Sequence, residues 1–366
     1  MFEPIVHRLI QRATVIATLS VAFILALAVT AQAAPKSFFG VVPQTSLASS
    51  DYEKMGQGHV GTLRVPLVWA AVEPTQAGGY NWGGFDPTVE EAARNGIKVL
   101  PFIYTTPGWV ARDLDGQNCG ESCGTFGPRS AAGRAAFGKF LAAAVDRYGP
   151  NGTFWTEHPS VPKKPIRAWQ IWNEQNSKVF WSPKPSTSKY AKLLAASADA
   201  VRSRDRGADI VLGGMAGLAG SRKATPGPKY LRKLYRRKGV KKNFDGVAVH
   251  PYGAKVGAVI DEVGNFRREI TRAHDGGASL WITEMGWSSA KKGNPLNVGK
   301  KGQAKRLKQA YKYFLRERKR LNVKTVDWFS WTDSQESICD WCQNAGLLTH
   351  SLKEKPAFRA FARLAK

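Results

Sequence analysis

From Phe38 onward the sequence alternates short apolar segments with longer segments of helical periodicity, and no linker interrupts the alternation. The short segments are apolar throughout, as expected for parallel strands that are buried on both faces. Eight segments are expected to form strands: Phe38–Pro43, Thr62–Trp69, Lys98–Tyr104, Ile166–Trp172, Asp209–Gly213, Gly246–His250, Leu280–Thr283 and Val326–Trp331.

Between these segments apolar residues recur at helical spacing. We expect helices over 87–95, 137–148, 190–201, 228–238, 256–274, 303–320 and 355–364. Eight β/α units in one uninterrupted chain predict an α/β fold with a single (β/α)8 TIM barrel over residues 35–366. An open doubly wound sheet is the alternative, but no glycine-rich phosphate-binding sequence follows the first strand.

Residues 1–34 have the three parts of a secretory signal peptide. Arg8 and Arg12 precede an apolar stretch over residues 13–30, and Ala31-Gln32-Ala33 offers small residues for cleavage. An uncleaved membrane anchor is the alternative, because the apolar stretch is almost long enough to span a bilayer. The small residues at its end favour cleavage, so we expect a secreted, extracellular protein.

The four cysteines form two tight pairs, Cys119/Cys123 and Cys339/Cys342. In an exported protein such pairs are typical of disulfides. Short separation favours a bridge within each pair, whereas crossed bridges would tie the two loops together. A zinc site with four thiolates is also compatible with the spacing of Cys339 and Cys342, but an oxidising compartment disfavours it. We therefore expect two local disulfides and no metal.

The formal net charge is +26, and two stretches carry much of it. Lys229–Lys242 has eight basic residues and no acidic one, and Lys300–Arg320 has ten basic residues against Glu317 alone. Apolar stripes predict helices whose basic residues lie on the outer face. A soluble, charged surface is the simplest interpretation, and attraction to an anionic polymer is the functional one. No recognition module for nucleic acid accompanies the charge, so nucleic acid is not an expected partner.

Two strand segments lead directly into a glutamate. Asn173 precedes Glu174 after the fourth segment, and Thr283 precedes Glu284 after the seventh. The carboxyl ends of barrel strands meet at one face, so the two carboxylates are expected to face each other across the mouth. Such a pair is what cleavage of a glycosidic bond requires. The alternative is two charged residues that merely cap their strands.

The other strand ends carry residues typical of sugar sites, where aromatic rings stack on sugar faces and polar groups bind hydroxyls. The candidate substrate-binding residues are Arg64, Trp69, Trp109, Asn173, His250, Tyr252, Trp287 and Trp331. Trp172, Trp181 and Trp341 are also expected near the cleft, although any single tryptophan could pack under a loop. Arg64 could instead pair with a barrel carboxylate, and His250 could be a hydrogen-bonded core residue.

At these residues the chain resembles the clan A retaining glycoside hydrolases. Trp172-Asn173-Glu174 is similar to the acid/base motif of the clan, and Ile282-Thr283-Glu284 is similar to its nucleophile motif. Leu63-Arg64-Val65-Pro66 resembles the second-strand arginine segment of family 5. Trp-Asn-Glu-x-Asn and His-Pro-Tyr-Gly resemble family 39 and related exopolysaccharide-cleaving enzymes. The resemblance spans residues 38–366.

The resemblance implies roles for the matching residues. Glu284 would attack the anomeric carbon, and Glu174 would protonate the leaving oxygen and later deprotonate water. Asn173 would bind the 2-hydroxyl of the sugar, and Tyr252 would orient Glu284. The two carboxyl groups are then expected about 5 to 5.5 Å apart, the separation found in retaining enzymes.

The same resemblance implies that Arg64 keeps Glu284 ionised, that His250 holds a hydroxyl or a neighbouring carboxylate, and that Trp331 forms the floor under the sugar. Together these features predict a secreted, monomeric, retaining β-glycosidase that needs no cofactor and acts within a polysaccharide. An exo-acting β-glycosidase and a non-catalytic polysaccharide-binding barrel are the alternatives. A surface-adhesion protein would also use the positive charge, but it would not need two glutamates at strand ends.

Overall fold

The computed structural model describes residues 34–217, 224–337 and 339–366. Lys36–Lys366 form one compact unit. The expected signal peptide, residues 1–34, lies outside the described residues apart from Ala34. Within the described ranges, no helix is both long and apolar enough to cross a membrane.

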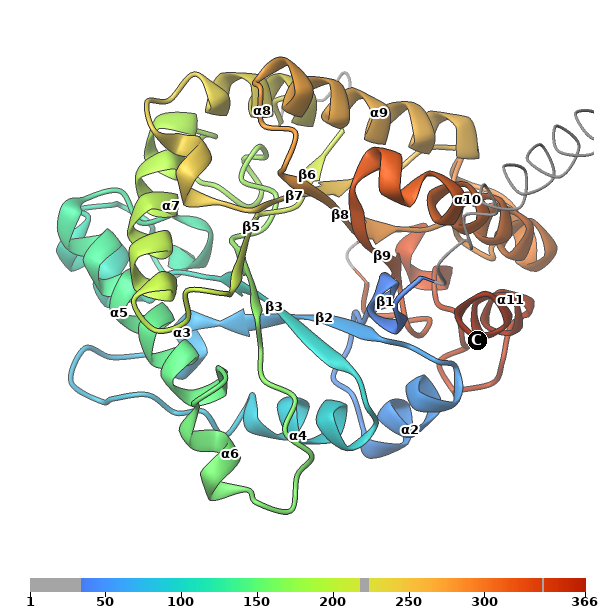
Figure 1. Ribbon diagram of the computed structural model, residues 1–366, viewed down its shortest axis with the longest axis horizontal. Coiled ribbons are helices and arrows are strands. Elements are labelled where there is room, and N and C mark those ends of the chain that lie inside the picture. Colours follow the sequence, from blue (N-terminus) through green and yellow to red (C-terminus); the bar gives the residue numbers. More distant parts are fainter. Residues whose placement is uncertain (1–33, 218–223, 338) are drawn as a thin grey trace, which may run out of the picture. The chain divides into compact units, whose positions relative to one another are not determined.

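A closed parallel barrel forms the centre of this unit (Figure 1). Its strands follow the order β5-β4-β3-β2-β1-β9-β8-β7-β6, and a pairing of Val211 with Gly246 joins β5 to β7 and closes the ring. β6 is a two-residue continuation of β5 beyond Gly213 and Gly214, so the two together supply one of eight barrel strands. The strands are β1 (Phe39–Val42), β2 (Thr62–Val68), β3 (Lys98–Tyr104), β4 (Ala168–Ile171), β5 (Asp209–Leu212), β6 (Met215–Ala216), β7 (Gly246–His250), β8 (Ser279–Met285) and β9 (Val323–Phe329).

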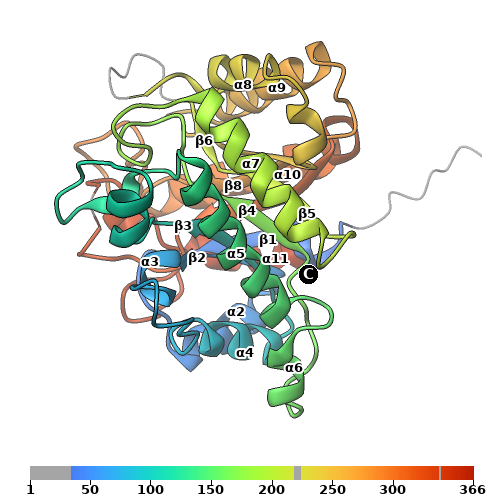
Figure 2. The same cartoon turned by 90° about the vertical axis from the view of Figure 1, so that its left-hand side faces the viewer.

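Helices surround the strands on the outside, as both views show (Figures 1 and 2). They are α2 (Ser49–Gln57), α3 (Trp69–Val72), α4 (Asp86–Arg94), α5 (Ala131–Tyr148), α6 (Thr153–Glu157), α7 (Thr187–Arg202), α8 (Gly227–Tyr235), α9 (Val256–Arg272), α10 (Gly299–Leu321) and α11 (Pro356–Ala365). Short helical turns add η1 (Lys36–Phe38), η2 (Val110–Leu114), η3 (Cys123–Thr125), η4 (Val240–Asn243) and η5 (Cys342–Asn344).

The barrel prediction is confirmed, and every expected strand and helix is present near its expected position. α5 begins six residues before the first apolar residue of its stripe, because the Ser130 hydroxyl accepts a hydrogen bond from the Gly133 amide and caps the helix there. α2 was not expected. It is short, and it turns only a few side chains, including Tyr52 and Met55, toward the core, too few for a clear periodic signal.

The barrel interior changes from apolar to polar. One apolar cluster joins Leu100, Val211, Ala248 and Trp281 from four different strands. Further side chains inside the barrel are polar and still fully buried, among them Arg64, Gln170 and Asp327. Because buried polar groups need partners, this second set determines how the mouth of the barrel is organised.

Asp327 is the least satisfied of these polar groups. Its Oδ1 accepts a hydrogen bond from Thr325, but its Oδ2 has no partner among the described residues. Burial raises the pKa of Asp327 to about 7, and the negative charge of Glu284 acts in the same direction, against the Thr325 hydrogen bond and Arg64. The backbone makes room for this carboxyl at Gly40, where a Cβ atom would lie 1.9 Å from Oδ1.

We expect Asp327→Asn to stabilise the protein more at pH 8 than at pH 5. An aspartate in the unfolded chain releases its proton near pH 4. Between there and about pH 7 the folded protein holds a proton that the unfolded chain has lost, so stability falls as the pH rises through this window. Asparagine stays neutral and removes that loss. Thermal unfolding of both proteins at the two pH values measures the effect, and an equal loss of stability at both would show that Asp327 is ionised in the fold.

Candidate active site

The backbone after β4 places Glu174 in an unusual conformation. Trp172 has a φ of 74° and Glu174 a φ of 40°, both in the left-handed region that residues other than glycine rarely adopt. The Glu174 amide donates to the carbonyl of Gly214, 2.9 Å away, which fixes the turn against the loop after β5. Strained backbone of this kind is concentrated at functional sites.

His250, the last residue of β7, touches both glutamates. Its Nδ1 lies 2.8 Å from Oε1 of Glu174, and its Nε2 lies 3.5 Å from Oε1 of Glu284. The same Nε2 is 3.1 Å from the hydroxyl of Thr283, and the ring is fully buried. Room for the ring depends on Gly214, where a Cβ atom would lie only 1.9 Å from Nε2. His250 thus bridges the two strand-end carboxylates.

Glu284 reaches the mouth because β8 is irregular. The register of β8 against β9 shifts between Ile282 and Met285. Such a shift breaks the alternation of side chains, so both Thr283 and Glu284 contact the site. The Glu284 carboxylate accepts hydrogen bonds from Arg64 and from the Tyr252 hydroxyl, each 2.8 Å long.

Arg64 ties three chain segments together from inside the barrel. Its guanidinium donates to Gln170 on β4 at 2.7 Å, to Asn173 at 2.7 Å and to Glu284 at 2.8 Å. The guanidinium also lies 4.1 Å from the centre of the Phe102 ring. All three polar bonds are charge-assisted, and the side chain is fully buried. Arg64 therefore lies in the site and also pairs with a barrel carboxylate, that of Glu284.

The surroundings favour the ionised form of Glu284. Burial alone would raise the pKa of this carboxyl, but attraction to His250 and Arg64, with hydrogen bonds from Tyr252 and Arg64, outweighs burial and lowers the pKa. Burial and the nearby Glu284 charge raise the pKa of Tyr252 well above its usual value, so its hydroxyl stays protonated and can donate. Glu284 is therefore a carboxylate held between two donors.

The two glutamates are close to each other. One carboxylate oxygen of Glu174, one of Glu284 and a ring nitrogen of His250 all lie within 4.8 Å of one another. These three side chains could in principle ligate a metal ion, but both oxygens of Glu284 already accept hydrogen bonds, one of them from the positively charged Arg64. The cluster brings together six of the sequence candidates: Arg64, Asn173, Glu174, His250, Tyr252 and Glu284.

Three tryptophans expected to contact sugar are fully buried: Trp69, Trp287 and Trp331. Each indole N–H is bound inside the protein, to Glu73, Gly253 and Asp51 respectively. No face of these rings is exposed for stacking, so the expectation of direct sugar contact is not met, nor is Trp331 a floor under the sugar. Closeness to a strand end did not reveal which way each side chain turns.

Other aromatic side chains remain partly exposed at this end of the barrel. They include Trp109, whose N–H donates to the Glu73 carbonyl at 3.2 Å, and Trp341. Phe329 and Trp341 lie against Tyr252, with ring centres 6.3 and 5.0 Å from it. Phe329, two residues before Trp331, is the residue at the end of β9 whose ring faces Tyr252. Gln170 was also missed, although alternation along β4 turns it and Ala168 to the same side.

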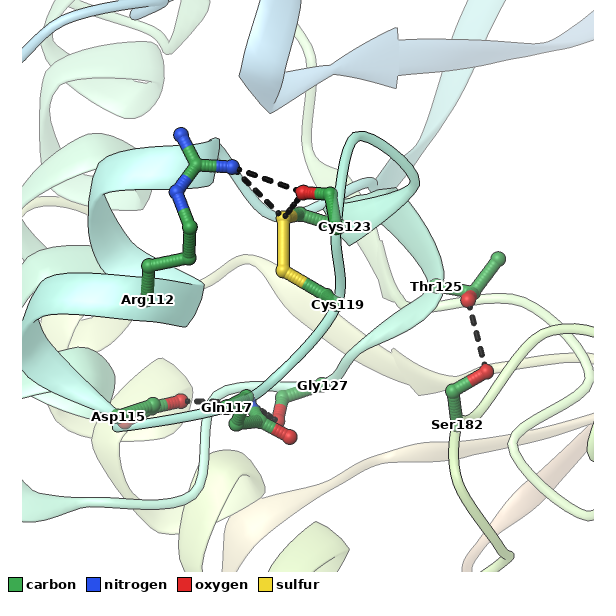
Figure 3. The surroundings of a disulfide bond; sticks show 9 residues. Arg112, Asp115, Gln117, Cys119, Cys123, Thr125, Gly127 and Ser182 are labelled. Carbon is green, nitrogen blue, oxygen red and sulfur yellow. Dashed lines mark hydrogen bonds between the residues drawn. A yellow bond between two sulfur atoms is a disulfide. The ribbon is translucent and has the colours of Figure 1, made fainter.

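Both cysteine pairs form local disulfides, Cys119–Cys123 and Cys339–Cys342, with Cα atoms 4.9 and 5.2 Å apart. The predicted pairing is confirmed, and these sulfurs are not free to bind zinc. In Figure 3 the guanidinium of Arg112 points at the first bridge and donates to Cys123 Sγ at 3.3 Å. The two bridges lie in the loops that follow β3 and β9, so each one restrains a loop at the mouth of the barrel.

A (β/α)8 barrel with paired glutamates at the ends of two strands defines a clan A glycoside hydrolase. The sequence matches the family described as the glycosyl hydrolase catalytic core over residues 168–355, about half of the chain. The protein belongs to this family. No curated protein matches the chain significantly.

Solved structures with the same fold include a family 39 glycoside hydrolase from Bacteroides cellulosilyticus, with 21% identity and a TM-score of 0.66 over 91% of this chain. The chain spans 64% of the length of that protein. A monomeric β-xylosidase from Caulobacter crescentus has 18% identity and a TM-score of 0.64, with 91% of this chain and 69% of that one covered. An intracellular xylanase from Thermoanaerobacterium saccharolyticum has 15% identity and a TM-score of 0.61, with 88% and 95% covered.

We expect Tyr252→Phe to move the acid limb of the pH–rate profile to higher pH. The lost hydrogen bond helps to keep the pKa of Glu284 low, so its removal raises that pKa and the carboxylate is protonated at a higher pH. At neutral pH, kcat/KM on an aryl glycoside should fall on the order of tenfold, the usual effect of losing a hydrogen bond to a charged group.

Tyr235→Phe is the matched control, since it removes a hydroxyl that binds Asp275, away from this cluster. The control should leave the pH–rate profile unchanged. An unaltered acid limb in Tyr252→Phe would show that Tyr252 does not set the charge state of Glu284.

Proposed function

We propose that the protein is a retaining β-glycosidase in which Glu284 is the nucleophile and Glu174 the acid/base. The observation that carries the proposal is the approach of the two carboxylates to within 4.8 Å, oxygen to oxygen. Retaining enzymes hold their carboxyl groups about 5 to 5.5 Å apart, whereas inverting enzymes leave about 6.5 to 9.5 Å for a water molecule. The short separation supports direct attack by a carboxylate.

In the first step an oxygen of Glu284 forms a bond to the anomeric carbon, and the bond from that carbon to the leaving oxygen breaks. The proton of Glu174 passes to the leaving oxygen. In the second step water attacks the same carbon, its proton returns to Glu174, and the ester to Glu284 breaks. Two inversions at one carbon give net retention.

The neighbouring contacts suit these roles. Arg64 and Tyr252 hold Glu284 as an ionised carboxylate that is ready to attack. His250 contacts Glu174 and Thr283, which fixes the direction of the acid. Asn173 accepts from Arg64 through its Oδ1, so its amide NH₂ is oriented and would donate to the 2-hydroxyl of the sugar.

We further propose a secreted, monomeric enzyme that acts within polysaccharide chains. Two disulfides are typical of proteins from oxidising compartments. Partly exposed tryptophans on two different loops, Trp109 after β3 and Trp341 after β9, would give an extended cleft that suits a polymer.

The sugar can be sought first among β-linked xylans, because a β-xylosidase and a xylanase are among the similar structures. The length of the products separates the two modes of action. Internal cleavage releases oligomers of mixed length from the start, whereas release of single sugars alone would mean exo action. We propose that no metal or other cofactor takes part, so a chelator should leave turnover unchanged.

We expect Glu284→Ala to abolish turnover and added azide to restore part of it, as a glycosyl azide of inverted configuration. The small anion fits the space of the missing carboxylate and replaces its attack. Glu174→Ala should slow cleavage of a glycan about 10² to 10⁴-fold, the usual contribution of an acid/base. It should slow an aryl glycoside less, because that leaving group needs little protonation.

NMR of the first product measures the anomer directly, and a product with the same configuration as the substrate is expected. An inverted first product, or near wild-type activity in both variants, would contradict the assignment of the two glutamates. It would leave membership of the family untouched.

The outer faces of α8, η4 and α10 support a second proposal, binding of an anionic polymer. All eight basic residues of Lys229–Lys242 are exposed, as are most of those in Lys300–Arg320. Carboxylates offset only part of this charge, as in the pairs of Arg232 with Glu269 and of Arg320 with Glu317. These surfaces lie on helices outside the barrel, so they would retain a polymer without entering the reaction.

We expect retention on an anionic polysaccharide to weaken steeply as salt rises past roughly 0.15 M, where charges are screened over about 8 Å. Turnover of a neutral aryl glycoside should not follow the salt concentration. A pull-down across a salt series, beside the glycoside assay, measures both. Retention that does not change with salt would contradict electrostatic binding of the polymer, and the positive charge would then serve solubility alone.

Reversal of charge at Arg236 and Lys238 should reduce retention. The control is the same reversal at Lys163 and Lys353, which gives a protein of the same net charge as the first variant and should preserve retention. Arg237 is left intact because it donates to the Thr187 hydroxyl.

A further inference from the structure

Trp341 lies one side chain away from the proposed nucleophile. Its ring centre is 5.0 Å from that of Tyr252, with an angle of 62° between the planes, and 5.8 Å from that of Phe329. Tyr252 in turn donates to Oε2 of Glu284 at 2.8 Å. The indole is partly exposed, whereas Trp69, Trp287 and Trp331 are fully buried. It therefore presents an aromatic surface beside the site that those three rings cannot offer.

The segment that carries Trp341 is held in place from several sides. The Cys339–Cys342 bridge encloses Asp340 and Trp341 in a short loop. The Cys342 carbonyl accepts from Gln44 at 3.0 Å. Such anchoring fixes where the indole lies before any ligand arrives, which reduces the ordering that binding would require.

A second anchor lies at Asn344, two residues after Cys342, and involves Lys355. Lys355 is almost completely buried, and its ammonium group binds Asp333 at 2.5 Å and the Asn344 carbonyl at 3.2 Å. The Asn344 carbonyl also accepts from the hydroxyl of Ser289 at 3.1 Å. The loop after β9 is thus tied to the loop after β8, and β8 is the strand that carries Glu284.

We propose that Trp341 is a sugar-binding residue that stacks on the apolar face of the glycone, the sugar on the Glu284 side of the cleaved bond. This inference rests on the proposed function. Aromatic rings bind the C–H faces of sugars, and a ring fixed by a disulfide does so with little loss of freedom. The Phe329 ring lies beside Trp341 and extends the same aromatic surface. The Cys339–Cys342 bridge positions Trp341 by holding its ring against Tyr252.

Trp341→Ala tests the proposal in kinetics. KM for the aryl glycoside should rise about tenfold, as expected for the loss of an aromatic contact, and Trp341→Phe should retain most of the affinity. The acid limb of the pH–rate profile should stay in place. A shifted acid limb with an unchanged KM would overturn the proposal, because Trp341 would then act only by supporting Tyr252.

Opening the bridge tests the role of the loop. The double variant Cys339→Ser/Cys342→Ser should raise KM in the same direction as Trp341→Ala. Cys119→Ser/Cys123→Ser is the matched control, with a local bridge in the loop after β3, and should leave KM unchanged. Thermal unfolding of all variants identifies any that fail to fold, and an equal rise in KM in both double variants would contradict a specific role for the second bridge.

A binding assay separates this proposal from the proposed function. Calorimetry is run with β-linked tetrasaccharides of xylose, glucose, mannose and galactose on the Glu284→Ala protein, with and without Trp341→Ala. Weaker binding of one tetrasaccharide, by about tenfold, when Trp341 is absent supports the proposal. Binding that is equal with and without Trp341 overturns it and leaves the glycosidase function standing. Failure of every tetrasaccharide to bind while Trp341 is present would overturn the proposed function itself.

Discussion

The site depends on the buried guanidinium of Arg64. It rises inside the barrel from β2 and donates to groups from β4, from the turn after β4 and from β8. A buried cation is stable only if its donors are satisfied and its charge is balanced, so Gln170, Asn173 and Glu284 are fixed together. The same charge makes it favourable for Glu284 to remain ionised in a buried position. One side chain therefore sets both the geometry of the mouth and the charge of the carboxylate within it.

The balance of charge extends below the site. Burial raises the pKa of Asp327 to about 7, so near neutral pH only part of the molecules carry a negative charge there to balance Arg64. Arg64 is then left to act mainly on Glu284, and Glu284 is also bound by Tyr252. The paired glutamates differ as a result: a guanidinium and a phenol donate to Glu284, whereas the His250 ring lies nearer to Glu174, at 2.8 Å, than to Glu284, at 3.5 Å. Distinct surroundings for two carboxylates are what an acid and a nucleophile require.

The fold and the six clustered residues could be predicted because they follow from local patterns. Short apolar strands and helical stripes define the barrel, and a barrel brings strand ends together whatever the loops do. Glu174 and Glu284 needed only their places at those ends. The tryptophans needed more, namely the direction of a side chain in an irregular segment, which depends on contacts far along the chain. Trp331 turns toward the outer helices, where Asp51 of α2 accepts its N–H across 280 residues and Phe358 of α11 packs on its ring, and Phe329 faces Tyr252 instead. Gln170 could have been predicted, because side chains alternate along a strand and Gln170 shares the inward side of β4 with Ala168.

The packing of His250 against Gly214 has a consequence for how this site can change. The ring that joins the two glutamates occupies a volume that exists because residue 214 has no side chain. Most parts of an active site can drift by compensating exchanges, since a lost hydrogen bond can be replaced by another donor. An absent atom has no such substitute. Even alanine at 214 would place a Cβ atom 1.9 Å from Nε2, displace the imidazole and disturb both carboxylates, so the place of the ring restricts this backbone position to glycine.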